Sequence, residues 1–304
     1  MTRVVFLGTP AAAVHALQHI ARVTDVGLVV TQPDRPKGRS KEPWPSHVKT
    51  AANDLQMTVV QPENRNDLLA NLRQAAPFDV GIVVAFGQIL THEMLQIPEH
   101  GFLNIHFSLL PRWRGAAPVE RAIMAGDSMT GATIIKLDEG LDTGPVLTAQ
   151  AIDLGGDDTG GAVTERLADI GARLLVRTLD SYLDGTLNVV PQVKEGSTYA
   201  KKLSPKDRPI QLEEGLSIAE RRIRALSPSP GATAVIDGEP FKILAAGPAE
   251  TTPAVGTWEL VDGIPVVGLS DGGLEVSLLQ PPGKKVMAGG DWARGIRRSG
   301  GVVE

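Results

Sequence analysis

The strongest constraint on the fold is a group of short segments in the first half of the chain that are apolar along nearly their whole length. These segments lie at residues 3–7, 26–31, 79–85 and 101–107. Continuous apolarity over this length indicates strands buried on both faces, as in a parallel sheet covered by helices. Stretches of helical length alternate with them, at residues 11–22, 46–55, 66–75 and 116–125. The pattern predicts an α/β fold with a mostly parallel sheet.

The chain length and a change in composition indicate two domains. The 304 residues are enough for two domains of ordinary size. After residue 188 the sequence becomes polar and is punctuated by prolines, which is typical of a linker. We predict a first domain at residues 1–189, a linker at 190–208 and a second domain at 209–304.

Each domain has further predicted elements. The first would end with a strand pair at residues 131–136 and 144–153 and a long helix at 157–183. The second would begin with a helix at residues 218–226. Short strands with Gly and Pro turns would follow, at residues 232–236, 241–245, 255–260, 265–269 and 274–278. Closely spaced short strands are typical of a small β-barrel.

Composition excludes several classes of function. The net charge is −5, so a nucleic acid would have to be bound by local basic patches. The chain has no Cys, which excludes disulfides, thiolate nucleophiles and Cys-based metal sites. The six His residues show no metal-binding spacing, so we expect no metal. No apolar run is long enough to span a membrane, and we expect a cytoplasmic monomer that makes no contact with membranes.

The first turn after a strand argues against a dinucleotide cofactor. Only Gly8 is present where a Gly-x-Gly-x-x-Gly fingerprint would need three glycines. We therefore expect neither NAD nor FAD to bind, and this turn would only start a helix.

The segment 104–118 contains the densest group of residues that could carry chemistry. Asn104 and His106 are two apart on a predicted strand, so their side chains leave the same face near its carboxyl end. Together they could donate hydrogen bonds to an oxyanion. Asp142 lies in a Gly-rich turn between two predicted strands, and its carboxylate near His106 would make the imidazole more basic and fix its orientation. The alternatives are a structural Asn–His pair and an ordinary turn aspartate.

Four stretches together resemble the folate-dependent formyltransferase family: Asn104-Ile105-His106, Ser108-Leu109-Leu110-Pro111, Arg114-Gly115 and Leu141-Asp142-Thr143-Gly144. The resemblance implies that Asn104, His106 and Asp142 are catalytic. It also implies that the loop formed by Ser108, Leu109, Leu110 and Pro111 lines a tetrahydrofolate pocket. The formyl donor would be 10-formyltetrahydrofolate, and no metal would be needed.

Residues 6–10, 31–39 and 280–287 are similar to the family members that act on methionyl initiator tRNA. This similarity implies a Rossmann-like formyltransferase domain followed by an OB-like β-barrel. The product would be N-formylmethionyl-tRNA for translation initiation. The sequence departs from the expected Ile-Asp-Trp run at Ile210-Gln211-Leu212, so the packing of the linker on the barrel could differ.

Basic residues suggest where tRNA would bind. The loop at 33–49 contains Lys37, Arg39, Lys41 and Trp44, and cations interleaved with an aromatic ring suit phosphate contacts and base stacking. A solvated surface loop is the alternative from composition alone. In the second domain we expect Lys284 and Lys285 to contact tRNA. Further positive clusters there are Arg221-Arg222-Arg224 and Arg294-Arg297-Arg298.

Two other functions compete with this one. A related enzyme could formylate a small amine, such as an amino sugar nucleotide or glycinamide ribonucleotide, with the same catalytic residues. The basic loop and the second domain argue against it, because a small acceptor needs neither. A non-catalytic tRNA- or folate-binding module is the other alternative, but it would have no need for the Asn, His and Asp together.

Overall fold

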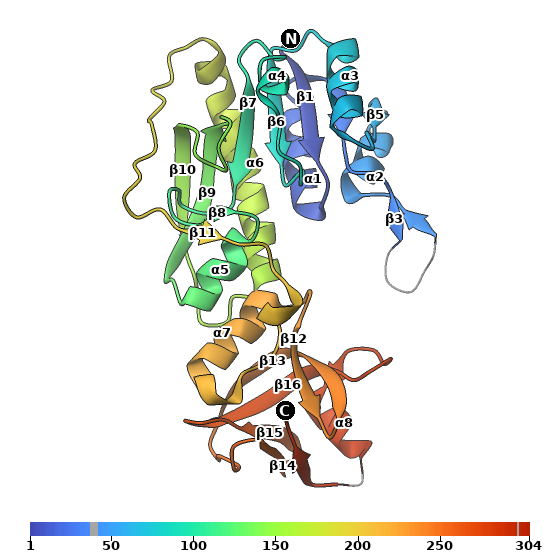
Figure 1. Ribbon diagram of the computed structural model, residues 1–304, viewed down its shortest axis with the longest axis vertical. Coiled ribbons are helices and arrows are strands. Elements are labelled where there is room, and N and C mark those ends of the chain that lie inside the picture. The colour runs from blue at the N-terminus through green and yellow to red at the C-terminus, as the bar shows by residue number, and fades with distance from the viewer. Residues whose placement is uncertain (37–41, 297) are drawn as a thin grey trace. The chain divides into compact units, whose positions relative to one another are not determined.

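The computed structural model describes residues 1–36, 42–296 and 298–304, and its contacts divide the chain into two compact units (Figure 1). The first unit comprises residues 1–118, 129–153 and 164–200. The second comprises residues 119–128, 154–163 and 201–304. A single cut at the polar segment would not give this division, because two inner segments cluster with the C-terminal part and residues 190–200 cluster with the first unit.

A seven-stranded sheet forms the centre of the first unit, with the strand order β10-β9-β7-β6-β1-β2-β5. The strands β1, β2, β5, β6 and β7 are parallel, and β9 pairs antiparallel with both β7 and β10. Their bounds are β1 Arg3–Gly8, β2 Asp25–Val30, β5 Val59–Val60, β6 Val80–Val84, β7 Phe102–His106, β9 Met129–Lys136 and β10 Val146–Asp153. The predicted α/β class with a mostly parallel sheet is confirmed.

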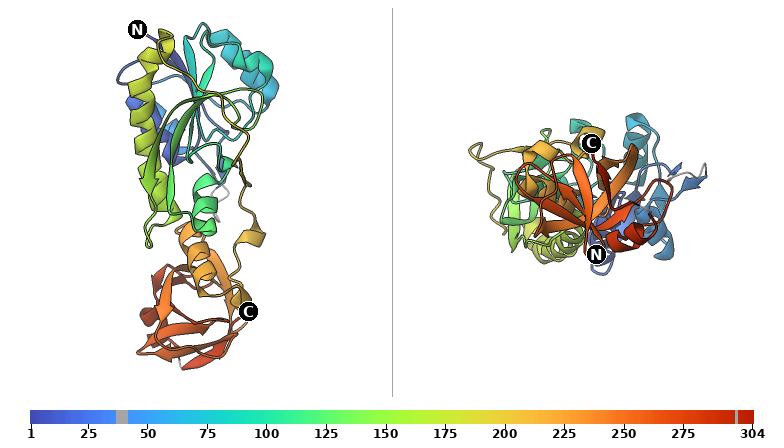
Figure 2. Two further views of the ribbon diagram at one scale, coloured as in Figure 1. Left: turned by 90° about the vertical axis from the view of Figure 1, so that its left-hand side faces the viewer. Right: turned by 90° about the horizontal axis from the view of Figure 1, so that it is seen from below.

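Helices cover both faces of this sheet. On one face, side chains of α1 (Ala11–Ile20), α2 (His47–Asp54) and α6 (Gly160–Leu183) pack in a cluster with Val4 and Phe6. On the other, α3 (Arg65–Ala75) and α4 (His92–Leu95) pack with Val5 and Leu7. Because side chains of β1 point alternately to the two covered faces, the strand is apolar at every position from Val4 to Leu7. Figure 2 shows α6 and α3 on opposite sides of the sheet.

Local sequence signals start two of these helices. Ser46 caps α2 by accepting the Lys49 backbone N–H, and Asn64 caps α3 by accepting the N–H groups of Asn66 and Asp67. Two short ribbons complete the first unit. In one, β3 (Arg35–Pro36) pairs antiparallel with β4 (Pro43–Trp44). In the other, β8 (Arg114–Gly115) pairs in parallel with β11 (Tyr199–Ala200).

An antiparallel sheet curls around the core of the second unit, with the order β12-β13-β16-β15-β14-β18 and β17 paired to β16. The strands are β12 Ala232–Ile236, β13 Glu239–Ala249, β14 Thr257–Val261, β15 Ile264–Gly268, β16 Gly273–Gln280, β17 Met287–Ala288 and β18 Gly300–Val302. Backbone pairing of Val235 with Glu304 joins the two edges of the sheet. The resulting barrel-like core surrounds Trp258, which is 1% exposed. The predicted OB-like barrel is confirmed in this form.

Three helices and two 3-10 turns belong to the described part of the second unit: α5 Pro118–Ala125, α7 Leu216–Leu226, α8 Gly289–Arg294 and the turns Pro205–Asp207 and Leu212–Glu214. The amphipathic α7 buries Ile223 and Leu226 in the barrel core. Sequence patterns did not predict α8, β18, α4 or β5, because each is too short to show a periodicity. Among the described residues, no helix combines the length and apolarity needed to cross a membrane.

Candidate active site

Two polar side chains lie side by side at the end of a central strand. Asn104 and His106 belong to β7, which is held between β6 and β9, and they are only 8% and 5% exposed. Their spacing of two residues places both on the same face of the strand, as the sequence predicted. Polar groups at such depth in an apolar sheet are costly unless they are hydrogen-bonded.

A cavity of about 430 Å³ opens at this edge of the sheet. The loop after β6 forms one wall, where Ala85 and Gly87 have positive φ angles of 46° and 86° that turn the chain back over the strand ends. Phe86, Ile89 and Leu141 supply much of the apolar lining. Asn104, His106 and Asp142 lie in the same lining. A mostly apolar cavity with a few convergent polar groups is typical of a small-molecule site.

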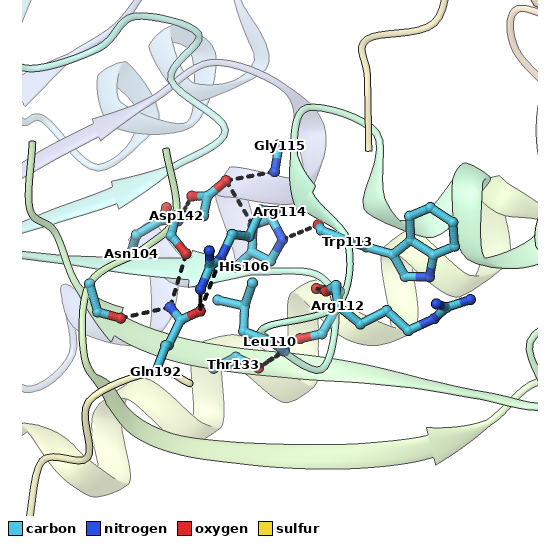
Figure 3. A network of polar contacts seen from close by, with 12 residues as sticks. Asn104, His106, Leu110, Arg112, Trp113, Arg114, Gly115, Thr133, Asp142 and Gln192 are labelled. Carbon is cyan, nitrogen blue, oxygen red and sulfur yellow. Dashed lines mark hydrogen bonds and ion pairs between the residues drawn. The ribbon is translucent and has the colours of Figure 1, made fainter. Parts of the chain in front are cut away.

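The backbone carbonyl of Trp113 orients the His106 ring. His106 Nε2 lies 2.8 Å from the Trp113 carbonyl oxygen. A carbonyl oxygen only accepts, so Nε2 carries the hydrogen and Nδ1 is left for other partners. Nδ1 lies 3.7 Å from Asp142 Oδ2, which is longer than a hydrogen bond, and the two groups form an ion pair only when the ring carries a proton on both nitrogens. Trp113 holds the ring through Nε2, and the Asp142 carboxylate lies beside Nδ1 (Figure 3), so an orienting role of Asp142 stays a prediction.

Asp142 is itself held by two donors. Its Oδ2 accepts the Gly115 backbone N–H at 2.8 Å, and its Oδ1 accepts the Asn104 amide at 3.4 Å. Asp142 has a positive φ of 52°, and the following Gly144 passes so close to Lys136 that a Cβ at residue 144 would lie 1.8 Å from the Lys136 carbonyl oxygen. The structure thus brings Asn104, His106 and Asp142 together through a tight turn that requires a glycine.

The loop formed by residues 108–111 lies beside the site rather than in the cavity wall. Within the described ranges, none of its four residues lines the cavity, whose walls come mainly from the segments 83–90, 104–107, 115–118 and 137–142. Ser108 Oγ donates to the Arg112 carbonyl at 2.6 Å, and Leu110 N–H donates to Thr133 Oγ1 at 3.3 Å. These bonds shape the turn that presents the Trp113 carbonyl to His106. Direct contact of folate with this loop remains a prediction from the resemblance.

The predicted tRNA residues are distributed over both units. Lys37, Arg39 and Lys41 lie outside the described residues. The flanking β3–β4 ribbon carries Trp44 with 57% of its surface exposed. Lys284 and Lys285 are exposed in the turn between β16 and β17.

The three arginines of α7 are engaged in contacts within the second unit. Arg221 donates to the Ala125 carbonyl, Arg222 pairs with Glu214 at 2.6 Å, and Arg224 donates to the Asp158 carbonyl. Each guanidinium is used to hold neighbouring segments of the second unit. The sequence could not indicate the contacts of Arg221 with Ala125 and of Arg224 with Asp158, because these partners lie in distant segments of the chain.

Sequence reasoning missed two residues of the site. Gln192 and Thr198 lie in the segment predicted as a linker, yet Gln192 donates to the Asp142 carbonyl at 2.9 Å, and Thr198 Oγ1 accepts the Trp113 N–H at 2.9 Å. No periodicity or motif marks them. Their position depends on tertiary contacts such as the pairing of β11, which follows them in the chain, with β8.

The described residues contain no group of three or more His, Asp or Glu side chains arranged to hold a metal ion.

Comparisons with known proteins point to one family. A family model described as formyl transferase matches residues 2–179, and one described as formyl transferase, C-terminal domain, matches residues 202–297. A methionyl-tRNA formyltransferase from Mycobacterium sp. (strain KMS) is 40% identical over 305 residues, covering 99% of each chain. A methionyl-tRNA formyltransferase from Aromatoleum aromaticum (strain DSM 19018 / LMG 30748 / EbN1) is 43% identical over 304 residues, covering 98% of this chain and 96% of the relative.

A solved structure shares the fold at much lower identity. The N-formyltransferase from Helicobacter canadensis, in complex with folinic acid and dTDP-3-aminofucose, aligns with a TM-score of 0.70 and 17% identity. The alignment covers 92% of this chain and 100% of that one. This likeness supports the fold alone.

Proposed function

The chain belongs to the formyl transferase family, and on this premise we propose that it transfers a formyl group from 10-formyltetrahydrofolate to the α-amine of methionyl initiator tRNA. The product is N-formylmethionyl-tRNA, used in translation initiation. The observation that carries the proposal is the convergence of Asn104, His106 and Asp142 at an apolar cavity in a chain that matches methionyl-tRNA formyltransferases over nearly its full length.

The cavity fits a flat, largely apolar donor. Its volume of about 430 Å³ and its Phe86, Ile89 and Leu141 walls suit an aromatic ring system, while Asn104 and His106 lie where a polar group of that donor would be needed. When bound, the donor supplies the formyl carbon as an electrophile.

Three side chains then act on the reacting atoms. The Asn104 amide and a protonated His106 Nδ1 donate hydrogen bonds to the formyl oxygen as negative charge develops on it. The neutral α-amine forms a new C–N bond to the formyl carbon, and the bond from that carbon to the donor nitrogen breaks. Asp142, held by the Gly115 N–H, receives the proton lost by the amine, directly or through water, for return to the donor nitrogen.

An acceptor comparison tests this function. The protein is incubated with 10-formyltetrahydrofolate and, in separate reactions, methionyl initiator tRNA, methionyl elongator tRNA, glycinamide ribonucleotide or a dTDP-amino sugar. We expect rapid formylation of the initiator tRNA only. Preference for a small amine would replace the proposed acceptor, and no product with any acceptor would refute a formyl transfer function.

We further propose that Lys37, Arg39, Lys41, Lys284 and Lys285 contact tRNA phosphates. Arg39→Ala and the Lys284→Ala/Lys285→Ala double variant should raise KM for tRNA several-fold and leave KM for the folate donor unchanged. Each lost phosphate contact should also reduce the dependence of log K on log salt by about one unit. Arg65→Ala, on the exposed start of α3, is the control. Unchanged salt dependence in both variants would show that these residues are ordinary surface cations.

A further inference from the structure

One side chain ties two loops of the catalytic site together. Gln192 Nε2 donates to the Asp142 carbonyl at 2.9 Å and to the Gly144 carbonyl at 2.7 Å. Its Oε1 accepts two hydrogen bonds from Arg114, from Nε at 3.1 Å and from Nη2 at 2.8 Å (Figure 3). A single amide therefore makes four hydrogen bonds, which uses all of its donors and acceptors.

The backbone path explains how Gln192 reaches this position. Val146 and Val190 form an antiparallel bridge, with N–H to O distances of 2.8 and 2.9 Å. Two residues after Val190, the backbone no longer pairs with this strand. The Gln192 side-chain amide instead donates to the backbone carbonyls of residues 142 and 144. Its neighbours at 191 and 193–196 are exposed, whereas Gln192 is partly buried. The side chain is thus turned inward from an otherwise exposed stretch.

The two loops that Gln192 joins hold the catalytic groups. The turn at 142–144 carries the Asp142 carboxylate. Arg114 is 6% exposed and precedes Gly115, whose N–H donates to that same carboxylate. A buried guanidinium needs its donors satisfied, and the amide oxygen of Gln192 does this without placing a second carboxylate beside Asp142.

We propose that Gln192 is a positioning residue that acts through Asp142: it holds the 142–144 turn at a fixed distance from Gly115 and His106. The proposal rests on the proposed function, because a formyl transfer that uses Asp142 is the reaction it serves. The Asp142 carboxylate lies 3.7 Å from His106 Nδ1, so a small displacement of the turn changes their interaction steeply. Misplacement of a catalytic group by about 1 Å can reduce the rate about 100-fold.

Two substitutions separate positioning from general stability. Gln192→Met keeps the length of the side chain and removes all four hydrogen bonds. Gln192→Glu keeps an acceptor for Arg114 but places a carboxylate oxygen against the Asp142 and Gly144 carbonyls, so it loses the contact with the turn and adds a second negative charge beside Asp142. Gln74→Met, at an exposed position of α3, is the matched control.

The experiment measures steady-state kinetics of methionyl-tRNA formylation, binding of tetrahydrofolate, and amide hydrogen exchange of Gly115 in the full chain. We expect both Gln192 variants to lower kcat about 10- to 100-fold, with folate Kd within about twofold of wild type. Gly115 exchange should accelerate at least about tenfold in both, with little change in the sheet core. Gln74→Met should behave as wild type.

Two results would overturn the proposal. Wild-type kcat in the Gln192 variants would show that the turn keeps its position without the amide. Loss of folate binding together with faster exchange throughout the first unit would show a merely structural role. The Gly115 measurement needs neither tRNA nor donor, so selective acceleration there in a protein that formylates no acceptor would refute the proposed function while supporting the positioning role.

Discussion

At the scale of the residue, the two ring nitrogens of His106 have different partners and therefore different roles. Nε2 donates to the Trp113 carbonyl at 2.8 Å, which fixes the ring. Nδ1 lies 3.7 Å from Asp142 Oδ2 and faces that carboxylate. In the proposed reaction, Nδ1 is therefore the ring nitrogen available to the reacting atoms. Trp113 adopts a positive φ of 63° in the turn that carries this carbonyl.

His106→Ala and Asp142→Asn should each lower kcat by about 100-fold or more, because each removes charge or proton transfer at the same reacting atoms. The double variant should be little worse than the worse single variant, since residues that act as a unit are not additive. Folate binding should survive in all three. Single-turnover formylation assays measure these effects, with Asp184→Asn, at an exposed aspartate bonded to Thr186, as control. Near-normal turnover in either single variant would contradict the assigned roles.

At the scale of the element, a compact hydrogen-bond network joins α2 to Asp34, the residue directly before β3. Lys49 Nζ from α2 donates to Asp34 Oδ2 and to Gln61 Oε1, both at 2.6 Å. Gln61 in turn donates to Asp34 Oδ1 at 2.6 Å. The hydrogen bond from Lys49, followed by that from Gln61, lowers the pKa of the Asp34 carboxyl below its ordinary value. This network fixes the position of Asp34, which precedes the predicted tRNA residues in the sequence.

Asp34→Asn should raise KM for tRNA several-fold and leave the folate KM unchanged, because it weakens the anchor without touching the cavity. The folded-state pKa of Asp34 is lowered, so its stabilising contribution is present above the ordinary pKa and is lost only as pH falls through the lowered value. The increase in tRNA KM caused by Asp34→Asn should therefore be constant from pH 8 to about 5. Asp25→Asn is the matched control, since Asp25 pairs with Arg3 on the surface with side chains 43% and 49% exposed. Equal tRNA KM in the two variants would argue against an anchoring role.

At the scale of the whole molecule, the chain crosses between its two compact units several times. Residues 119–128 and 154–163 belong with the C-terminal part, and α7 arginines hold both segments through backbone carbonyls. A fragment that ends near residue 204 would leave these two segments without their partners. Full-length variants are therefore the appropriate material for testing the second unit.

The ion pair between Arg121 of α5 and Asp207 is one of the contacts within that unit. Its N–O distance is 2.6 Å, both side chains are 20% exposed, and hydrogen bonding to Arg121 lowers the pKa of Asp207 to about 2. Asp207→Asn should reduce the free energy of unfolding by about 1–2 kcal/mol at pH 7. A lowered folded-state pKa contributes stability above the unfolded pKa, so the difference from wild type should shrink as pH falls from about 4 toward 2.

Urea denaturation at several pH values measures this difference. Asp291→Asn is the control, because its i,i+3 pair with Arg294 is far more exposed and should contribute little. A wild-type unfolding free energy in Asp207→Asn at pH 7, or a difference that grows as the pH falls, would contradict the predicted role of the pair.

The amino-acid sequence by itself determined the sheet, the order of its main elements and the identity of the residues that meet in the site. Continuous apolar runs predicted β1, β2, β6 and β7, and the spacing of Asn104 and His106 placed both on one face. These are local properties, because strand periodicity and burial depend on neighbours in the chain. The Gly-rich turn singled out Asp142 as a candidate, and the resemblance implied that it belongs to the same catalytic group as His106, which no local pattern could show.

Only the tertiary structure decided how those residues are held. The Trp113 carbonyl orients His106, the Gly115 N–H holds Asp142, and Gln192 returns from a segment whose composition resembles a linker. The short elements α4, α8, β5 and β18 and the grouping of residues 119–128 with the C-terminal unit were also decided there. The physical reason is common to all of them: a hydrogen bond between residues 50 apart, or a strand of two or three residues, is stabilised by partners that are close only after the chain has folded.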